Sequence, residues 1–174
     1  LDATSFTEII PKASLASYNY VVYAKNGKLT SEPASSNDCV TGEAIEPDYM
    51  ELFSTETPMK LYTVIDANND GNTWKWGMYD NTDGYIYSMF SNAHGNDDWF
   101  ITPPIHLKPK YKYTLSFLGQ EWLAKCPNTL EIKYGKAASL EAMTNTIQAT
   151  TALTADMKEY SYTISVAEDA TYFI

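Results

Sequence analysis

The chain has 174 residues, of which 44% are apolar and 14% aromatic, so it can bury a hydrophobic core and is not a disordered tail. Its net charge of −10 argues against nucleic acid as a partner and favours divalent cations. No apolar run approaches the roughly 18 residues of a membrane-spanning helix, so membrane insertion is not expected. The 14 tyrosines, with many Thr, Ser and Asn residues, fit pleated strands and turns, which predicts a mostly β protein.

The first part of the chain predicts about three strands. In "YNYVVYA", Tyr18, Tyr20 and Val22 fall on one face of an alternating segment. Residues 31–48 are loop-like and rich in Ser, Pro and Asn, which places a domain boundary near Glu43, between segments 1–43 and 44–174. Three strands cannot close a sandwich by themselves, because they bury too little apolar surface.

The second part predicts a sandwich of two antiparallel sheets. Alternating apolar and polar residues predict strands at 60–65, 85–90, 99–105, 113–117, 130–134 and 160–166, with one short helix at 137–143. The positions expected to be largely buried are Leu115, Phe117, Leu130, Ile132, Tyr162 and Ile164. Glu131 and Lys133 should face outward, because a slip of one residue would expose the whole apolar set.

The segment "DANNDG" begins at Asp66 and resembles a calcium loop. Its residues fit positions one, three, five and six of an EF-hand, but position twelve is Gly77 rather than Glu and both flanks predict strands, so it is not an EF-hand. Two alternatives remain: a looser structural calcium site with Asp66, Asn68 and Asp70 as oxygen ligands, or an Asx-turn held by its own backbone bonds. Other acids nearby in the sequence are Asp80, Asp83, Asp97 and Asp98.

Several aromatic residues raise the question of a sugar-binding surface. They are Trp74, Trp76, Tyr79, Tyr85, Tyr87 and Trp122. Alternation places the two tryptophans of residues 74–76 on one strand face and the two tyrosines of 85–87 on one face of another strand, so at least one pair is expected in the core. The run Trp99–Phe100–Ile101, which precedes two prolines, is also assigned to the core rather than to a recognition surface.

No catalytic residues are predicted. The sequence lacks the motifs of metalloproteases, α/β-hydrolases, P-loop NTPases and dinucleotide-binding enzymes. His94 and His106 are expected to be isolated surface histidines, and the adjacent Asp97 and Asp98 should point to opposite faces of a strand, so they cannot flank one bond. Cys39 and Cys126 are either two unpaired thiols or one disulfide.

The stretch "YNYVVYAKNGKLTSEPASS" resembles the C-terminal half of a fibronectin type III domain. It has a Tyr-x-Tyr-x-Val strand, the hairpin turn "KNGK" and a Ser-x-Pro before a last strand. The earlier strands of that family and their tryptophan are absent. The resemblance therefore implies a partial domain over residues 1–43.

Three motifs over residues 44–174 resemble the cleaved-adhesin and choice-of-anchor J family. They are "VIDANNDGNTWKW", "NDDWFITPPIHL" and "KYKYTLSFLGQEW", followed by "LEIKYGKAASLEAM". The resemblance implies an antiparallel jelly-roll sandwich, related to galactose-binding-like and MAM modules. The family continues beyond "ATYFI" to a further strand, so a fragment of a longer protein is expected, as is also indicated by a start at Leu1 instead of Met.

The family resemblance implies a non-catalytic adhesion or ligand-binding module of a larger protein, secreted or on the surface of a Gram-negative bacterium. The expected partners are a host or matrix protein, or a glycan, and the other domains of the parent protein; the expected cofactor, if any, is structural Ca²⁺. The alternative is a carbohydrate-binding module attached to a secreted hydrolase. A cleft lined by coplanar, exposed aromatic residues would favour that alternative, whereas a flat sheet face would favour adhesion.

Overall fold

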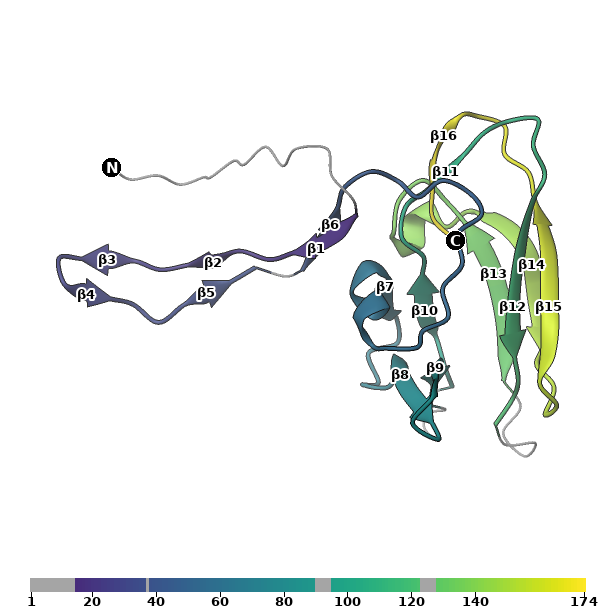
Figure 1. Ribbon diagram of the computed structural model, residues 1–174, viewed down its shortest axis with the longest axis horizontal. Coiled ribbons are helices and arrows are strands. Elements are labelled where there is room, and N and C mark those ends of the chain that lie inside the picture. The colour runs from purple at the N-terminus through teal and green to yellow at the C-terminus, as the bar shows by residue number, and fades with distance from the viewer. Residues whose placement is uncertain (1–14, 37, 90–94, 123–127) are drawn as a thin grey trace. The chain divides into compact units, whose positions relative to one another are not determined.

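The computed structural model describes residues 15–36, 38–89, 95–122 and 128–174 (Figure 1). The chain divides into two units, Leu1–Glu43 and Ala44–Ile174. Within the described ranges the regular structure is almost entirely β, with two short 3₁₀ turns. No helix among these residues is long and apolar enough to cross a membrane.

The first unit is a long antiparallel ribbon rather than three separate strands. It is built from the nested pairs β1 (Ala16–Tyr18) with β6 (Cys39–Thr41), β2 (Val21–Val22) with β5 (Ala34–Ser35), and β3 (Lys25–Asn26) with β4 (Leu29–Thr30). The predicted "KNGK" turn is its tip, where Gly27 takes the left-handed φ of +62° that favours glycine. None of its described side chains is buried, so the ribbon has no core of its own.

Two serines explain why the ribbon consists of short strands. At the first break, the Ser36 amide donates to the Tyr20 carbonyl (2.8 Å), while the Tyr20 amide donates to the Ser36 hydroxyl (2.9 Å). Ala24 and Ser31 make the same exchange at the second break, at 2.9 and 3.0 Å. In each case a side-chain oxygen replaces a backbone carbonyl, which interrupts the ladder without leaving an amide unpaired.

Within its described residues, the second unit holds ten strands and both 3₁₀ turns. In chain order they are η1 (Thr57–Leu61), β7 (Thr63–Asp66), β8 (Trp74–Tyr79), β9 (Asp83–Ser88), β10 (Asp98–Ile101), β11 (Ile105–Leu107), β12 (Tyr113–Gly119), β13 (Thr129–Tyr134), η2 (Leu140–Ala142), β14 (Asn145–Ala152), β15 (Lys158–Ile164) and β16 (Ala170–Tyr172).

All strand pairs in this unit are antiparallel, and three of them are nested. The pair β13–β14 lies within β12–β15 in sequence, which lies within β11–β16. Nesting of this kind is the winding of a jelly roll, in which one long hairpin rolls up into two sheets. The remaining pairs are β7–β10 and β8–β9. A parallel bridge between Ile45 and Ile105 joins the start of the unit to β11.

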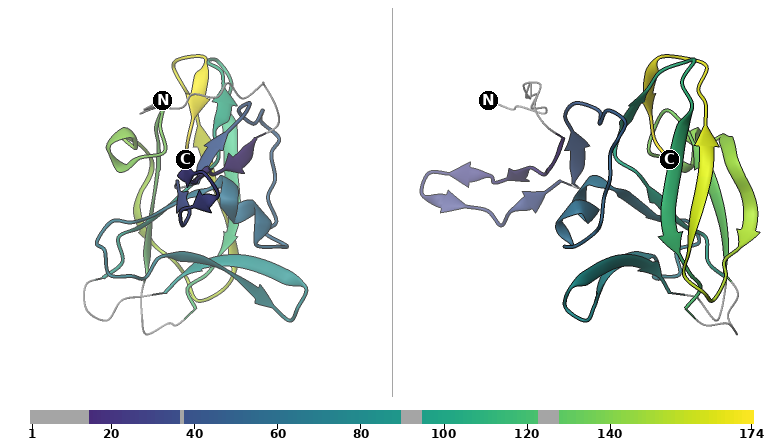
Figure 2. Two further views of the ribbon diagram at one scale, coloured as in Figure 1. Left: turned by 90° about the vertical axis from the view of Figure 1, so that its left-hand side faces the viewer. Right: turned by 45° about the vertical axis from the view of Figure 1, so that its right-hand side comes forward.

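Figures 1 and 2 show the two layers of this sandwich. The strands β12, β13, β14 and β15 form one layer, and β7, β8, β9 and β10 lie opposite. The buried cluster consists of Leu107, Ile164, Val166 and Tyr172. The prediction of an all-β antiparallel sandwich is confirmed.

The predicted alternation is confirmed, although the predicted depth of burial is only partly correct. Ile132 and Ile164 are buried and Glu131 is exposed, as expected. Four predicted core residues are only half-buried: Leu115, Phe117, Leu130 and Tyr162. Lys133, expected outward, is half-buried as well. Its ammonium lies 5.6 Å from the centre of the Trp99 ring, and β13 has register shifts on both sides of Ile132 that disturb simple alternation.

The predicted helix at 137–143 is wrong in extent. Only Leu140–Ala142 form a 3₁₀ turn. This segment packs directly on Gly135, where an added Cβ would come 2.0 Å from the carbonyl oxygen of Ala142. Seven residues are also too few to offset the cost of nucleating an α-helix, so packing decides the conformation.

Candidate functional site

The segment "DANNDG" forms the tight loop that joins β7 to β8. Its backbone turns through left-handed conformations at Asn69 (φ 55°) and Gly71 (φ 82°). The carboxylate of Asp66 accepts from the amides of Asp70 (3.2 Å) and Gly71 (2.8 Å), and that of Asp70 accepts from the amide of Asn72 (2.8 Å). Internal side-chain bonds therefore order the loop, as an Asx-turn requires.

Asn68 ties this loop to a second segment. Its amide nitrogen donates to the carbonyl of Gly95 at 2.8 Å and to the Asp70 carboxylate at 3.4 Å. Its amide oxygen lies 3.3 Å from the Asp70 nitrogen. The three residues predicted as calcium ligands thus lie together, because the loop folds back on Asp66.

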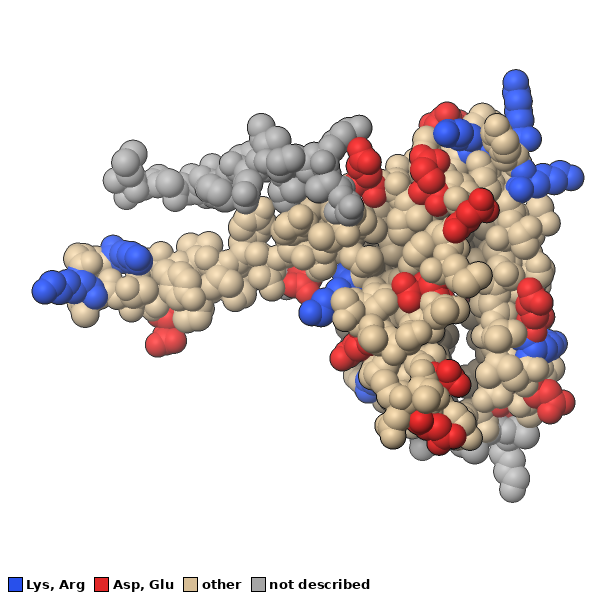
Figure 3. All heavy atoms as spheres, viewed as in Figure 1, with Lys and Arg blue, Asp and Glu red and all other residues tan. Residues whose placement is uncertain are grey.

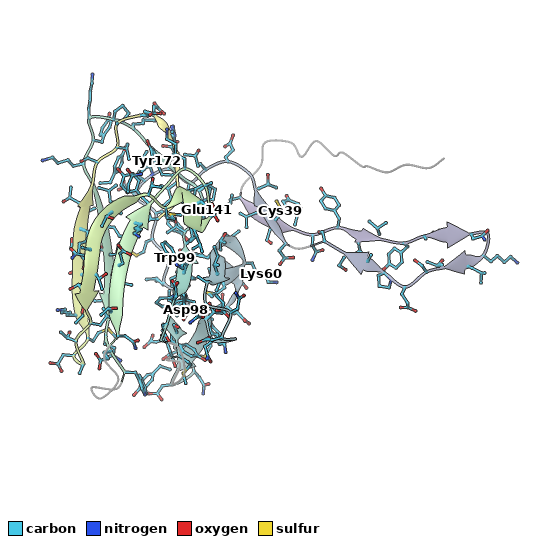
Figure 4. All side chains as sticks on the ribbon, turned by 180° about the vertical axis from the view of Figure 1, so that it is seen from behind. Cys39, Lys60, Asp98, Trp99, Glu141 and Tyr172 are labelled. Atoms are coloured by element: carbon cyan, nitrogen blue, oxygen red, sulfur yellow. The ribbon has the colours of Figure 1, made fainter. Side chains whose placement is uncertain are left out.

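The structure adds Asp98 to this group. Asp98 pairs with Asp66 across β10 and β7, and Figure 4 shows it near the β8–β9 end of the unit. One carboxylate oxygen accepts from the Ser88 hydroxyl (2.8 Å), while the other, Oδ1, is buried and makes no hydrogen bond of good geometry among the described residues. Burial first, and then the charges of Asp66 and Asp70, raise the pKa of Asp98, whereas hydrogen bonding by the hydroxyls of Ser88 and Thr73 lowers it.

The other acids considered from the sequence do not join the group. Asp83 pairs with Tyr79 at the far end of the β8–β9 hairpin, and Asp80 lies in the turn there. Asp97 accepts instead from the indole nitrogen of Trp99 at 3.1 Å. Asp97 and Asp98 therefore have different partners.

The loop offers only oxygen donors, which is the chemistry that Ca²⁺ prefers. The buried Oδ1 of Asp98 makes no hydrogen bond of good geometry to a described residue, but the Thr73 hydroxyl lies close enough to lower the pKa of this carboxylate, so a cation is not needed to satisfy it. Across the described residues, no three Asp, Glu, His or Cys side chains are grouped closely enough to hold a metal ion by themselves. A calcium shell at this loop would therefore need the Asn68 amide oxygen, backbone carbonyls or water.

The aromatic pairs separate to the two faces of the β8–β9 hairpin. The indole nitrogens of Trp74 and Trp76 donate to the backbone carbonyls of Asp98 (3.1 Å) and Phe53 (2.7 Å), which ties the tryptophan face to the rest of the unit. Tyr85 and Tyr87 lie on the other face. Trp122 is exposed. The tryptophan pair therefore faces the interior of the unit, and the tyrosine pair faces away from it.

The core assignment of the run at Trp99 is confirmed for Ile101, whereas Trp99 and Phe100 are only half-buried. Ile101 is 1% exposed and Pro103 is also fully buried. Phe100 stacks on Tyr62 with a ring-centre distance of 4.5 Å and also meets the ring of Trp74 at 5.8 Å. Phe100 of β10 thus packs against Tyr62 and Trp74, and β10 pairs with β7, the strand that leads into the candidate metal loop.

The expectation of an isolated surface histidine is wrong for His106. Its Nδ1 lies 2.7 Å from Glu46 Oε1 and its Nε2 lies 2.6 Å from Asp169 Oδ1. A neutral imidazole donates from only one nitrogen, so this geometry requires the imidazolium. The hydrogen bond that His106 donates to Glu46, followed by the one that it donates to Asp169, raises the pKa of His106. His106 thus connects the start of the unit to the loop before β16.

We expect this arrangement to make stability depend on pH. Because the pKa of His106 is raised in the folded state, its stabilising contribution is fully present below the unfolded value of about 6.5 and is lost as pH rises through the higher folded value. NMR titration should therefore find His106 titrating above about 6.5, and the melting temperature should fall across that step. The His106→Gln variant should lack this step. Titration of His106 at or below its ordinary pKa would contradict the arrangement.

The hydrogen bonds of His106 also bear on its use in catalysis. Both nitrogens of His106 hydrogen-bond to carboxylates, so neither is available as a general base. His94 and Cys126 lie outside the described residues. Cys39 is exposed on β6, and both alternatives, unpaired thiols or a disulfide with Cys126, stay predictions.

The sequence matches no family model and no curated protein. The fold, however, is that of a cleaved adhesin domain, an all-β sandwich. A similar solved structure is the K1 cleaved adhesin domain of Lys-gingipain (Kgp) from Porphyromonas gingivalis W83, with 19% sequence identity and a TM-score of 0.52. The match covers 71% of this chain and 84% of that chain. The predicted resemblance is confirmed at the level of the fold, and the fibronectin type III resemblance of residues 1–43 stays a prediction.

Proposed function

We propose that the chain is a non-catalytic adhesion or ligand-binding module of a larger protein, secreted or on the surface of a Gram-negative bacterium. The observation that carries this proposal is the likeness of the fold to the K1 adhesin domain. In this proposal residues 44–174 carry the binding surface, and residues 1–43 are the end of a preceding fibronectin type III domain.

Two observations support a binding role over a catalytic one: the spread of the acidic side chains, and the hydrogen bonds that engage both nitrogens of His106. Figure 3 shows acidic side chains spread over the visible face of the second unit rather than gathered in one place. His106 is held by Glu46 and Asp169, and the adjacent Asp97 and Asp98 have separate partners. The side chains best suited to acid–base chemistry are thus used to hold the fold.

Calcium, in this proposal, is structural. Asp66, Asn68 and Asp70 would supply the side-chain ligands, with backbone carbonyls or water completing the shell. The ion would fix the β7–β8 loop and thereby the base of the β8–β9 hairpin. No reaction is assigned to it.

The proposed role is tested with the whole 174-residue chain against immobilised collagen, fibronectin and fibrinogen, together with a panel of peptide and glycoside substrates. We expect saturable binding to at least one surface and no turnover. Reproducible hydrolysis that disappears in an Asp98→Asn or His106→Gln variant would show that the module is an enzyme. A chain that binds nothing on these surfaces or on glycans would overturn the adhesion role.

A further inference from the structure

The outer face of the β8–β9 hairpin carries a group of aromatic residues that the fold does not bury. Cross-strand pairing places Lys75 opposite Tyr87, Gly77 opposite Tyr85, and Tyr79 opposite Asp83. We call the six residues Lys75, Gly77, Tyr79, Asp83, Tyr85 and Tyr87 the tyrosine face. The opposite face is fixed by the two tryptophans, so the tyrosine face is turned away from β7 and β10.

Gly77 decides how the two rings lie. A Cβ added there would come 2.9 Å from Cζ of Tyr85 and 3.1 Å from Cε1 of Tyr87, so both rings extend across the backbone of the neighbouring strand. Their centres are 5.6 Å apart and their planes are inclined by 45°. Tyr85 remains 39% exposed. Both rings therefore cover the strand; Tyr85 leaves more of its surface to a ligand than Tyr87, which is half-buried.

Covering a glycine with an aromatic ring also stabilises a hairpin, which accounts for the position of the rings. It does not account for the polar groups around them. Among the described residues, the hydroxyls of Tyr79, Tyr85 and Tyr87 and the ammonium of Lys75 have no hydrogen-bond or ion-pair partner. A purely apolar partner would bury these hydroxyls and the ammonium at a cost in binding free energy, because their hydrogen bonds to water would be lost and no others would form.

We propose that the tyrosine face binds a glycan; this inference rests on the proposed ligand-binding function. A sugar ring presents C–H groups on one side and hydroxyls around its edge, which matches aromatic rings bordered by phenols, an ammonium and a carboxylate. The two rings are inclined and lie on an open sheet face, so the proposed site is a patch on an adhesion module and not the cleft of coplanar rings of a carbohydrate-binding module. Lys75 and Asp83 both hydrogen-bond readily to sugar hydroxyls, which favours a glycan over a hydrophobic peptide.

The test begins with the whole chain on an array of neutral, uronate-containing and sialylated oligosaccharides. The strongest binder is then titrated calorimetrically with variants. Tyr85→Ala and Tyr87→Ala should each weaken binding roughly three- to tenfold, because each removes one ring contact. Tyr111→Ala, which removes a tyrosine that is 62% exposed outside this face, should leave affinity unchanged.

Gly77→Ala is the sharpest variant, because it displaces the rings while leaving both tyrosines in the chain. Gly77 has no left-handed φ, so alanine fits its backbone. Binding should weaken about as much as in Tyr85→Ala, with thermal unfolding recorded to confirm a folded chain. Unchanged affinity in the Gly77 and tyrosine variants, or no glycan binding at all, would overturn the glycan proposal. If the chain still adheres to matrix proteins in that case, the proposed function stands and the partner is a protein.

Discussion

Replacing Ile164 by Ala is expected to lower the free energy of unfolding by about 2–5 kcal/mol. Ile164 is 3% exposed and belongs to the cluster with Leu107, Val166 and Tyr172, which joins β11, β15 and β16. The substitution removes buried methyl groups and leaves a cavity where three strands meet. Chemical denaturation of the whole chain measures the effect, and the melting temperature should fall by several degrees.

Thr163→Ala is the matched control, since Thr163 precedes Ile164 on the same strand and faces solvent. Its effect should stay within about 0.5 kcal/mol. Comparable losses in the two variants would mean that the register of β15 is wrong, because a shift of one residue exchanges its inward and outward side chains.

Calcium is expected to stabilise the chain measurably. Two carboxylates in the loop and no bidentate Glu predict a Kd on the order of 10⁻⁴ to 10⁻³ M, as in extracellular modules. At about 10 mM Ca²⁺ and a Kd near 10⁻³ M, mass action adds roughly 1.4 kcal/mol to the free energy of unfolding. Differential scanning calorimetry in calcium and in chelator should therefore show a higher melting temperature in calcium, by about 3–6 °C.

The double variant Asp66→Asn and Asp70→Asn should abolish this difference between calcium and chelator. Its melting temperature in chelator should also fall, because Asp66 accepts two backbone hydrogen bonds with its two oxygens and an amide can accept with only one. Asp83→Asn changes one charge at the other end of the β8–β9 hairpin and should keep the calcium effect. Identical unfolding of the unaltered chain in calcium and in chelator would identify the loop as a plain Asx-turn.

The sequence was a reliable guide to the class of fold and to which side chains share a face. Leu115 and Phe117 alternate with exposed residues on β12, and Tyr162 and Ile164 do so on β15, as the pattern predicts. The spaced motifs also indicated the cleaved-adhesin fold. Both inferences rest on local information, because a strand turns successive side chains to opposite sides whatever it pairs with.

The depth of burial required the structure. Phe117 is only half-buried, although it stacks on the buried Tyr160 at 5.4 Å. Alternation likewise separated the tryptophan and tyrosine faces of the β8–β9 hairpin but did not say which one turns inward. The carbonyls of Phe53 and Asp98 decide that, since they accept the two indole N–H groups.

The composition of the sites was decided by contacts between residues far apart in the chain. The sequence placed Asp66, Asn68 and Asp70 in one loop, but only the pairing of β7 with β10 brings Asp98 beside them. His106 looked isolated because Glu46 and Asp169 are 60 and 63 residues away. Alternation is a property of each strand's own backbone, whereas these contacts depend on the register between strands, which packing of the whole sandwich sets.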